Sequence, residues 1–200
     1  MADPFKTRVV RRRDDGRMTA TAERYARLAD AFEAKVAAVD PAQWDARTPC
    51  DQWDARRLVG HVIDVHGMML GPLDRTLSPA PSAADDAVGA FIAARADVEA
   101  VLDDPTLAGT EYDGALGRTQ VGQTIDRFLG FDLVVHGWDL ARATGQDETI
   151  APARVEEVWG MAQGLGDNLR RSGVCGLAVP VADDAPLQDR LLGLLGRDPG

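Results

Sequence analysis

One stretch of the sequence, residues 125–145, constrains the fold more than any other. Its apolar residues recur with the spacing of a helix, and Gly145 stands where helices commonly end. Asp132, His136 and Asp139 fall on the same stripe as these apolar residues, within about 60° of one another on a helical wheel. A buried carboxylate without a partner is costly or takes up a proton, so these groups need a partner. Because Asp132 and His136 are four residues apart, they can hold one divalent metal from a single helix.

A second expected helix, residues 54–70, carries another candidate ligand. His61 lies in the middle of its apolar stripe, whereas His66 is rotated by about 140° from it and is not expected to share its site. His61, Asp132 and His136 together offer two nitrogens and one carboxylate. Three protein ligands leave a fourth position open, as in catalytic zinc sites. The same donors suit iron, nickel or manganese.

Each candidate residue also has an ordinary structural interpretation. A histidine on an apolar face is often a satisfied core residue, and a carboxylate four residues from a histidine can form a helix ion pair. Asp139 could hydrogen-bond an imidazole or act as a further ligand. Cys50, expected near His61, could be a nucleophile, a ligand or a small buried residue. Arg95 and Arg142 could bind a substrate carboxylate or form structural ion pairs.

The remaining pattern predicts an all-α protein. Residues 1–17 form a basic leader without apolar periodicity, which is expected to be flexible and to add nothing to the core. Residues 18–200 are expected to form one helical bundle with four principal helices and one or two accessory C-terminal helices. Residues 106–120 read as an irregular crossing that includes a short hairpin. The expected helices are residues 21–39, 54–70, 84–103, 125–144, 152–173 and 187–195.

Composition excludes several classes of function. The net charge of −10 argues against nucleic acid or an anionic membrane surface as the main partner. No apolar run is long enough to cross a bilayer, and no signal peptide is evident. Two cysteines are too few for a disulfide framework, which fits a reducing cytoplasm.

Three phrases resemble the mycothiol-dependent maleylpyruvate isomerase N-terminal-domain group of the DinB-like superfamily: residues 48–53 (TPCDQW), 58–62 (LVGHV) and 132–145 (DLVVHGWDLARATG). Residues 180–199 also resemble an actinobacterial branch of that group that is described only as metal-binding. The resemblance implies an up-down-down-up four-helix bundle with a divalent metal at one end of its core. It places the ligands at His61, Asp132 and His136. The isomerase has Glu at the position of Asp132, so this carboxylate is one methylene shorter.

The resemblance also implies a function. Characterised relatives join a low-molecular-weight thiol, mycothiol or bacillithiol, to a substrate, so the expected partners are such a thiol and a small-molecule electrophile. The expected metal is zinc, with nickel, iron or manganese as alternatives, and a homodimer is compatible with this reading. The sequence shows no counterpart of the isomerase's separate C-terminal domain, so we expect a metal-dependent thiol S-transferase or isomerase with another reaction. A metal-dependent hydrolase and a non-enzymatic bundle that binds metal or a small ligand remain open.

Overall fold

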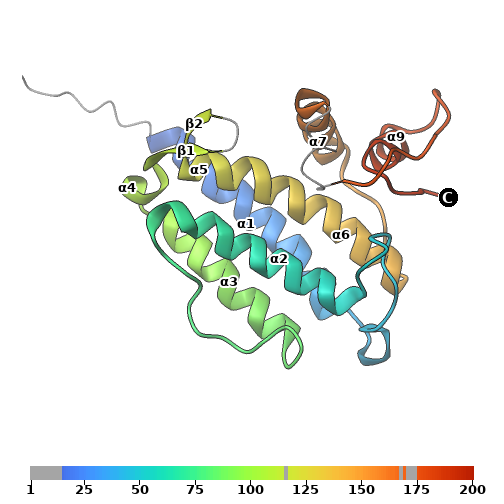
Figure 1. Ribbon diagram of the computed structural model, residues 1–200, viewed down its shortest axis with the longest axis horizontal. Helices are drawn as coiled ribbons and strands as arrows, with labels where there is room; N and C mark the ends of the chain where they lie inside the picture. The colour runs from blue at the N-terminus through green and yellow to red at the C-terminus, as the bar shows by residue number, and fades with distance from the viewer. Residues whose placement is uncertain (1–14, 115–116, 167–168, 170–174) are drawn as a thin grey trace, which may run out of the picture.

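The computed structural model describes residues 15–114, 117–166, 169 and 175–200, and its core is a bundle of four helices (Figure 1). In this bundle α1 (Asp15–Ala37) contacts α3 (Ala87–Leu102) and α6 (Gly130–Thr144). The fourth helix, α2 (Ala55–Leu70), also contacts α3 and α6. α2 and α3 run in one direction and α1 and α6 in the other, because the loop of residues 71–86 returns the chain along the bundle. The predicted all-α bundle is confirmed.

Local capping explains where the bundle helices begin and end. The side chain of Asp54 accepts a hydrogen bond from the backbone N–H of Arg57 at 2.8 Å, so Asp54 caps α2, as one of the two expected caps. Asp86 caps α3 in the same way, and this helix begins at Ala87, three residues later than predicted. Gly145 has a φ of 67° and ends α6 as predicted, because glycine enters this left-handed region without steric cost.

The core lies between the four helices and is mainly apolar. The rings of Phe32 on α1 and Phe91 on α3 lie 4.9 Å apart, and both are fully buried. Arg95 of α3 joins α1 to this core through ion pairs with Glu33 at 2.9 Å and with Asp30 at 2.7 Å. The structural interpretation of Arg95 is therefore the one that the contacts support.

The chain enters α6 through an interrupted helix rather than the single regular one that was predicted. α5 (Val121–Thr124) leads into a π-helical segment, η3 (Ile125–Leu129), and this continues into α6. The helical run thus begins four residues earlier than expected. Before it, α4 (Pro105–Ala108) is followed by an antiparallel hairpin of β1 (Glu111–Gly114) and β2 (Gly117–Gln120), so the short hairpin is confirmed.

Two accessory helices form a second, smaller core on the outer side of α6. α7 (Pro152–Leu165) ends earlier than predicted, and of the remaining predicted span, residues 167–168 and 170–173 lie outside the described residues. α9 (Leu187–Leu194) packs against α7, with Leu191 and Leu195 buried. The described part of the chain also has two short 3-10 turns, η1 (Pro41–Gln43) and η2 (Gly71–Leu73).

The basic leader can be compared with the structure only at its end. α1 begins at Asp15, so residues 15–17 belong to the first helix, and residues 1–14 lie outside the described residues. Within the part of the chain that is described, no helix has both the length and the apolar character needed to cross a bilayer.

Candidate metal centre

The three predicted ligands come together between α2 and α6. Nε2 of His136 lies 3.3 Å from Oδ1 of Asp132, and Nε2 of His61 lies 3.8 Å from the same oxygen. One ligand atom from each of the three residues falls within 4.8 Å of the other two, which is the spacing of donors around one ion. The alignment of Asp132 and His136 follows from the sequence, since they are one turn apart on α6. His61 joins them because α2 is a direct neighbour of α6.

An orphaned oxygen supports the fit of a cation at this place. Oδ2 of Asp132 is buried and has no hydrogen-bond partner within the described part of the chain. A buried carboxylate oxygen without a partner is costly, and a cation held with His61 and His136 would satisfy it. Two imidazoles and one carboxylate are donors that divalent transition metals accept. We therefore treat the three residues as a candidate metal centre.

The charges within this group are strongly coupled. Burial alone would raise the pKa of Asp132, but the charge of His136 and hydrogen bonds from His136 and His61 hold it well below its usual range. Burial alone would lower the pKa of His136, but Asp132 and Asp139 raise it well above its usual value. Without a metal, protonated His136 therefore balances the negative charge of Asp132.

Metal uptake at this site should depend on pH through His136. Because a ligand must give up its proton, affinity should fall about tenfold for each pH unit below the raised pKa of His136. The His136–Asp132 ion pair of the metal-free protein is fully present below the unfolded pKa of about 6.5 and is lost as the pH rises through the higher folded pKa. Stabilisation by added zinc should therefore grow between about pH 6 and about pH 8, which melting curves with and without zinc would measure. Equal stabilisation at both pH values would contradict it.

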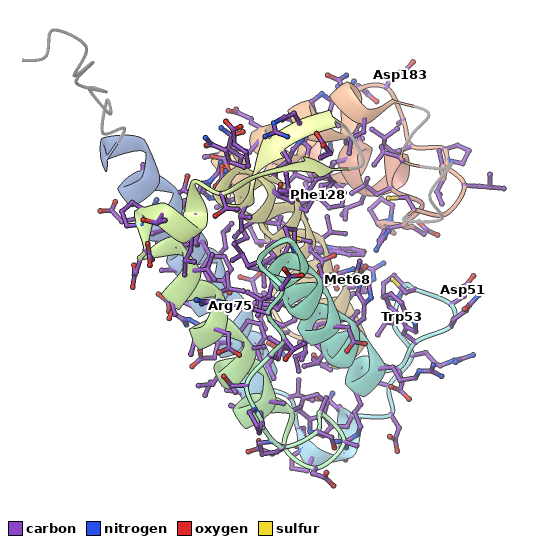
Figure 2. All side chains as sticks on the ribbon, turned by 60° about the vertical axis from the view of Figure 1, so that its left-hand side comes forward. Asp51, Trp53, Met68, Arg75, Phe128 and Asp183 are labelled. Atoms are coloured by element: carbon purple, nitrogen blue, oxygen red, sulfur yellow. The ribbon has the colours of Figure 1, made fainter. Side chains whose placement is uncertain are left out.

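A loop before α2 covers one side of the candidate metal centre. The ring of Trp53 stacks on that of His61 with centroids 4.3 Å apart, and lies 5.8 Å from that of His136. The hydroxyl of Thr48 donates to the carbonyl of Trp53 at 2.9 Å and fixes the loop, on which Asp51 points outward (Figure 2). The spacing of apolar residues in the sequence did not indicate this position of Trp53. Its only signal was its place in the phrase formed by residues 48–53.

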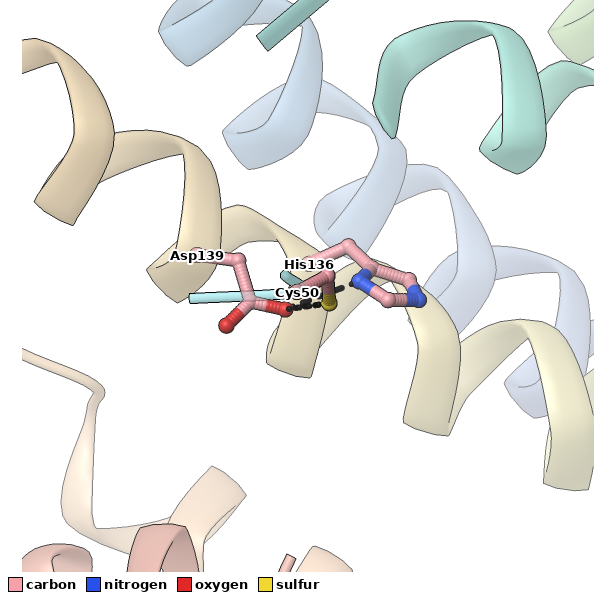
Figure 3. Close-up of side chains that lie close together, drawn as sticks. All are labelled: Cys50, His136 and Asp139. Carbon is pink, nitrogen blue, oxygen red and sulfur yellow. Dashed lines mark hydrogen bonds and ion pairs between the residues drawn. The ribbon is translucent and has the colours of Figure 1, made fainter. Parts of the chain in front are cut away.

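The opposite nitrogen of His136 faces a different set of partners (Figure 3). Its Nδ1 lies 2.9 Å from Oδ2 of Asp139, whose side chain is 0% exposed. The thiol of Cys50 donates to the same oxygen at 3.5 Å. Arg197, from the C-terminal end of the chain, donates to both carboxylate oxygens of Asp139. Cys50 is therefore placed on the Nδ1 side of His136, away from the three candidate ligands' shared oxygen.

Among the residues that the structure describes, two groups of donors could hold an ion, and the contacts distinguish them. Cys50, His136 and Asp139 form the second group. A guanidinium nitrogen of Arg197 already lies 2.7 Å from Asp139 and 3.3 Å from the sulfur of Cys50, so this place holds a cation of the protein itself. The group that contains Asp132 keeps an unsatisfied oxygen instead. The contacts therefore favour the first group as the candidate metal centre, with Asp139 beside His136 as the residue that can orient its ring.

The other candidates of the sequence analysis lie elsewhere. His66 is fully buried and its Nδ1 donates to the carbonyl of Val62 at 2.7 Å, one helical turn before it, so it stays apart from His61 as expected. Arg142 pairs with Glu148 at 2.7 Å, which is the structural interpretation.

Comparisons with known proteins agree with these features. A family model described as the mycothiol maleylpyruvate isomerase N-terminal domain matches residues 25–141. The chain is also similar to two uncharacterised proteins of Mycobacterium tuberculosis, one from strain CDC 1551 and one from strain H37Rv. Each is 30% identical over 178 residues, which cover 86% of this chain and 94% of the relative. No solved structure matches the chain significantly.

Proposed function

Because the chain belongs to the mycothiol maleylpyruvate isomerase N-terminal domain family, we propose that it is a metal-dependent enzyme that uses a low-molecular-weight thiol, mycothiol, as co-substrate. The reaction class is transfer of the thiol to a small electrophile, or isomerisation through such an adduct. The observation that supports this most strongly is the convergence of His61, Asp132 and His136, with an unsatisfied oxygen on Asp132.

The three residues have different tasks in this proposal. Asp132 supplies the only negative charge among the three ligands, and its lowered pKa keeps it ionised. His136 offers Nε2, because its Nδ1 is engaged by Asp139. The side chain of His61 is 32% exposed against 9% for His136, so the site is open to small molecules on the His61 side. A divalent metal held there would keep a coordinated thiol ionised and act as a Lewis acid toward an electrophile.

The arrangement needs no nucleophile from the protein. The sulfur of Cys50 is engaged by the buried Asp139–Arg197 pair, at 3.5 Å and 3.3 Å. Trp53 flanks His61 and supplies an aromatic wall beside the open side. Specificity for the electrophile would then depend on what packs against this wall.

A conjugation assay tests the proposal. Purified protein loaded with zinc is mixed with mycothiol and a chlorinated bimane, and formation of the fluorescent conjugate is followed. We expect conjugation above the uncatalysed rate, with a loss of at least about 100-fold in His61→Ala, because an essential ligand on the open side is removed. Asp64→Asn serves as matched control, since Asp64 is an exposed carboxylate on the same helix and is expected to keep full activity.

The assay also separates the other classes. Hydrolysis of activated esters without any thiol would contradict the proposal and favour a metal-dependent hydrolase. Turnover of neither substrate by a protein that still binds zinc would favour a binding protein without catalytic activity.

A further inference from the structure

We propose that Arg197 is a positioning residue of the candidate metal centre, which makes the C-terminal end of the chain part of that site. The inference rests on the proposed metal site and concerns the pair Arg197–Asp139, which lies behind His136. It assigns to a residue near the end of the chain the task of holding a ligand on α6 in its binding orientation.

The contacts form a continuous chain from Arg197 to the ligand. Nε of Arg197 donates to Oδ1 of Asp139 at 3.1 Å, and Nη2 donates to Oδ2 at 2.7 Å, so the guanidinium holds both oxygens. The same Oδ2 lies 2.9 Å from Nδ1 of His136. Two parallel hydrogen bonds from a planar guanidinium fix the plane of a carboxylate, which a single contact does not. The carboxylate in turn fixes the imidazole ring and its tautomer.

Burial makes this pair dependent on both members. The side chain of Asp139 is 0% exposed and that of Arg197 is 6% exposed. Both oxygens of this buried carboxylate have partners, because Arg197 donates to Oδ1 and Oδ2 and Nδ1 of His136 lies 2.9 Å from Oδ2. If the guanidinium is removed, the buried carboxylate loses the two hydrogen bonds that fix its plane. The direction of its contact with Nδ1 of His136 is then no longer fixed.

The backbone after α9 places the guanidinium of Arg197 next to Asp139. Gly196 has a φ of 84°, and a Cβ there would lie 3.0 Å from the carbonyl oxygen of Leu177, so this turn requires glycine. The backbone N–H of Arg197 donates to the carbonyl of Leu192 at 2.9 Å, and its Nη1 donates to the carbonyl of Leu195 at 2.8 Å. The backbone and the guanidinium of Arg197 are thus both hydrogen-bonded to the α9 segment. Since Leu191 and Leu195 belong to the small core that includes Phe131 and Val135 of α6, the position of Arg197 is tied to the helix that carries the ligands.

Cobalt(II) binding tests the inference without any need for catalytic activity. Visible absorption of cobalt(II) reports its coordination geometry, and titration gives the affinity. In Arg197→Ala we expect affinity to fall about 10–100-fold, with an altered spectrum, as is typical when the group that orients a ligating histidine is lost. Millimolar guanidinium chloride should restore part of the affinity and the spectrum, while sodium chloride at the same concentration should not. Arg190→Gln is the matched control, because Arg190 is an exposed arginine on α9 that lies over Trp159 and should bind cobalt as the unchanged protein does.

The outcomes separate this inference from the metal site itself. If the unchanged protein binds no cobalt, the metal site fails and the inference fails with it. If the unchanged protein binds cobalt and His136→Ala does not, but Arg197→Ala has unchanged affinity and spectrum, only the inference is overturned. If Arg197→Ala does not fold, Arg197→Lys tests the inference instead. This variant keeps the positive charge but cannot donate the two parallel hydrogen bonds to the carboxylate of Asp139. We expect a smaller loss of affinity with a shifted spectrum in this variant, and unchanged binding would overturn the inference.

Discussion

His136→Ala is expected to lose at least about 100-fold in metal affinity, the largest functional effect of any single substitution in this protein. His136 is the residue on which the site depends from both sides, since Nε2 faces Asp132 at 3.3 Å and Nδ1 faces Asp139 at 2.9 Å. Its loss would leave His61 and Asp132 on different helices as the only two ligands. It would also leave Asp139 without one of its buried partners. Elemental analysis of protein purified without a histidine tag measures the loss.

His66 provides the control for the His136 substitution. This histidine is also fully buried, yet its ring contacts Phe91 at 5.5 Å and lies outside both donor groups. His66→Gln is therefore expected to lower stability while keeping metal content. If His136→Ala retains stoichiometric metal with unchanged affinity, the assignment of the three ligands is wrong.

Phe91→Ala is expected to cause the largest loss of stability, about 3–5 kcal/mol. Phe91 is 0% exposed and its ring touches residues of two other helices, with centroids 4.9 Å from Phe32 on α1 and 5.5 Å from His66 on α2. Truncation removes these contacts and leaves a cavity between three helices, which rigid neighbours fill only in part. Urea unfolding measures the free energy, and the melting temperature should fall by roughly 6–20 °C for a domain of this size.

The adjacent residue supplies the control. Ile92 follows Phe91 on α3 and is 44% exposed, because neighbours in a helix point about 100° apart. Ile92→Ala is expected to change stability by about 0.5 kcal/mol or less. Similar losses in the two variants would mean that α3 is turned about its axis relative to the described packing.

The parts of the fold that sequence predicts are those decided within a few residues. Asp54 caps α2 through the N–H of Arg57, and Gly145 ends α6, so both boundaries could be read locally. The alignment of Asp132 and His136 needs only helical spacing. The pairing of these two with His61 also required that α2 and α6 be neighbours, for which the family resemblance supplied the reason.

Other features depend on packing between distant parts of the chain. Arg197 and Asp139 are 58 residues apart in sequence, and nothing in the local pattern around a lone arginine indicates a buried partner. The stacking of Trp53 on His61 likewise depends on how the loop before α2 folds back over the helix. Two charged residues, Asp132 and Asp139, were expected to need partners, but sequence could not say that one of these partners comes from the C-terminal end.

The π-helical segment Ile125–Leu129 lies directly before α6, the helix that carries Asp132 and His136. A π turn holds one residue more than an α turn of the same span, and each residue of an α-helix turns the chain by about 100°. Converting this π segment to α geometry would take up the loss of a single residue. Loss of one residue from this segment is therefore expected to leave Asp132 and His136 directed at His61, whereas the same loss between Asp132 and His136 would turn one ligand away from the other by about 100°.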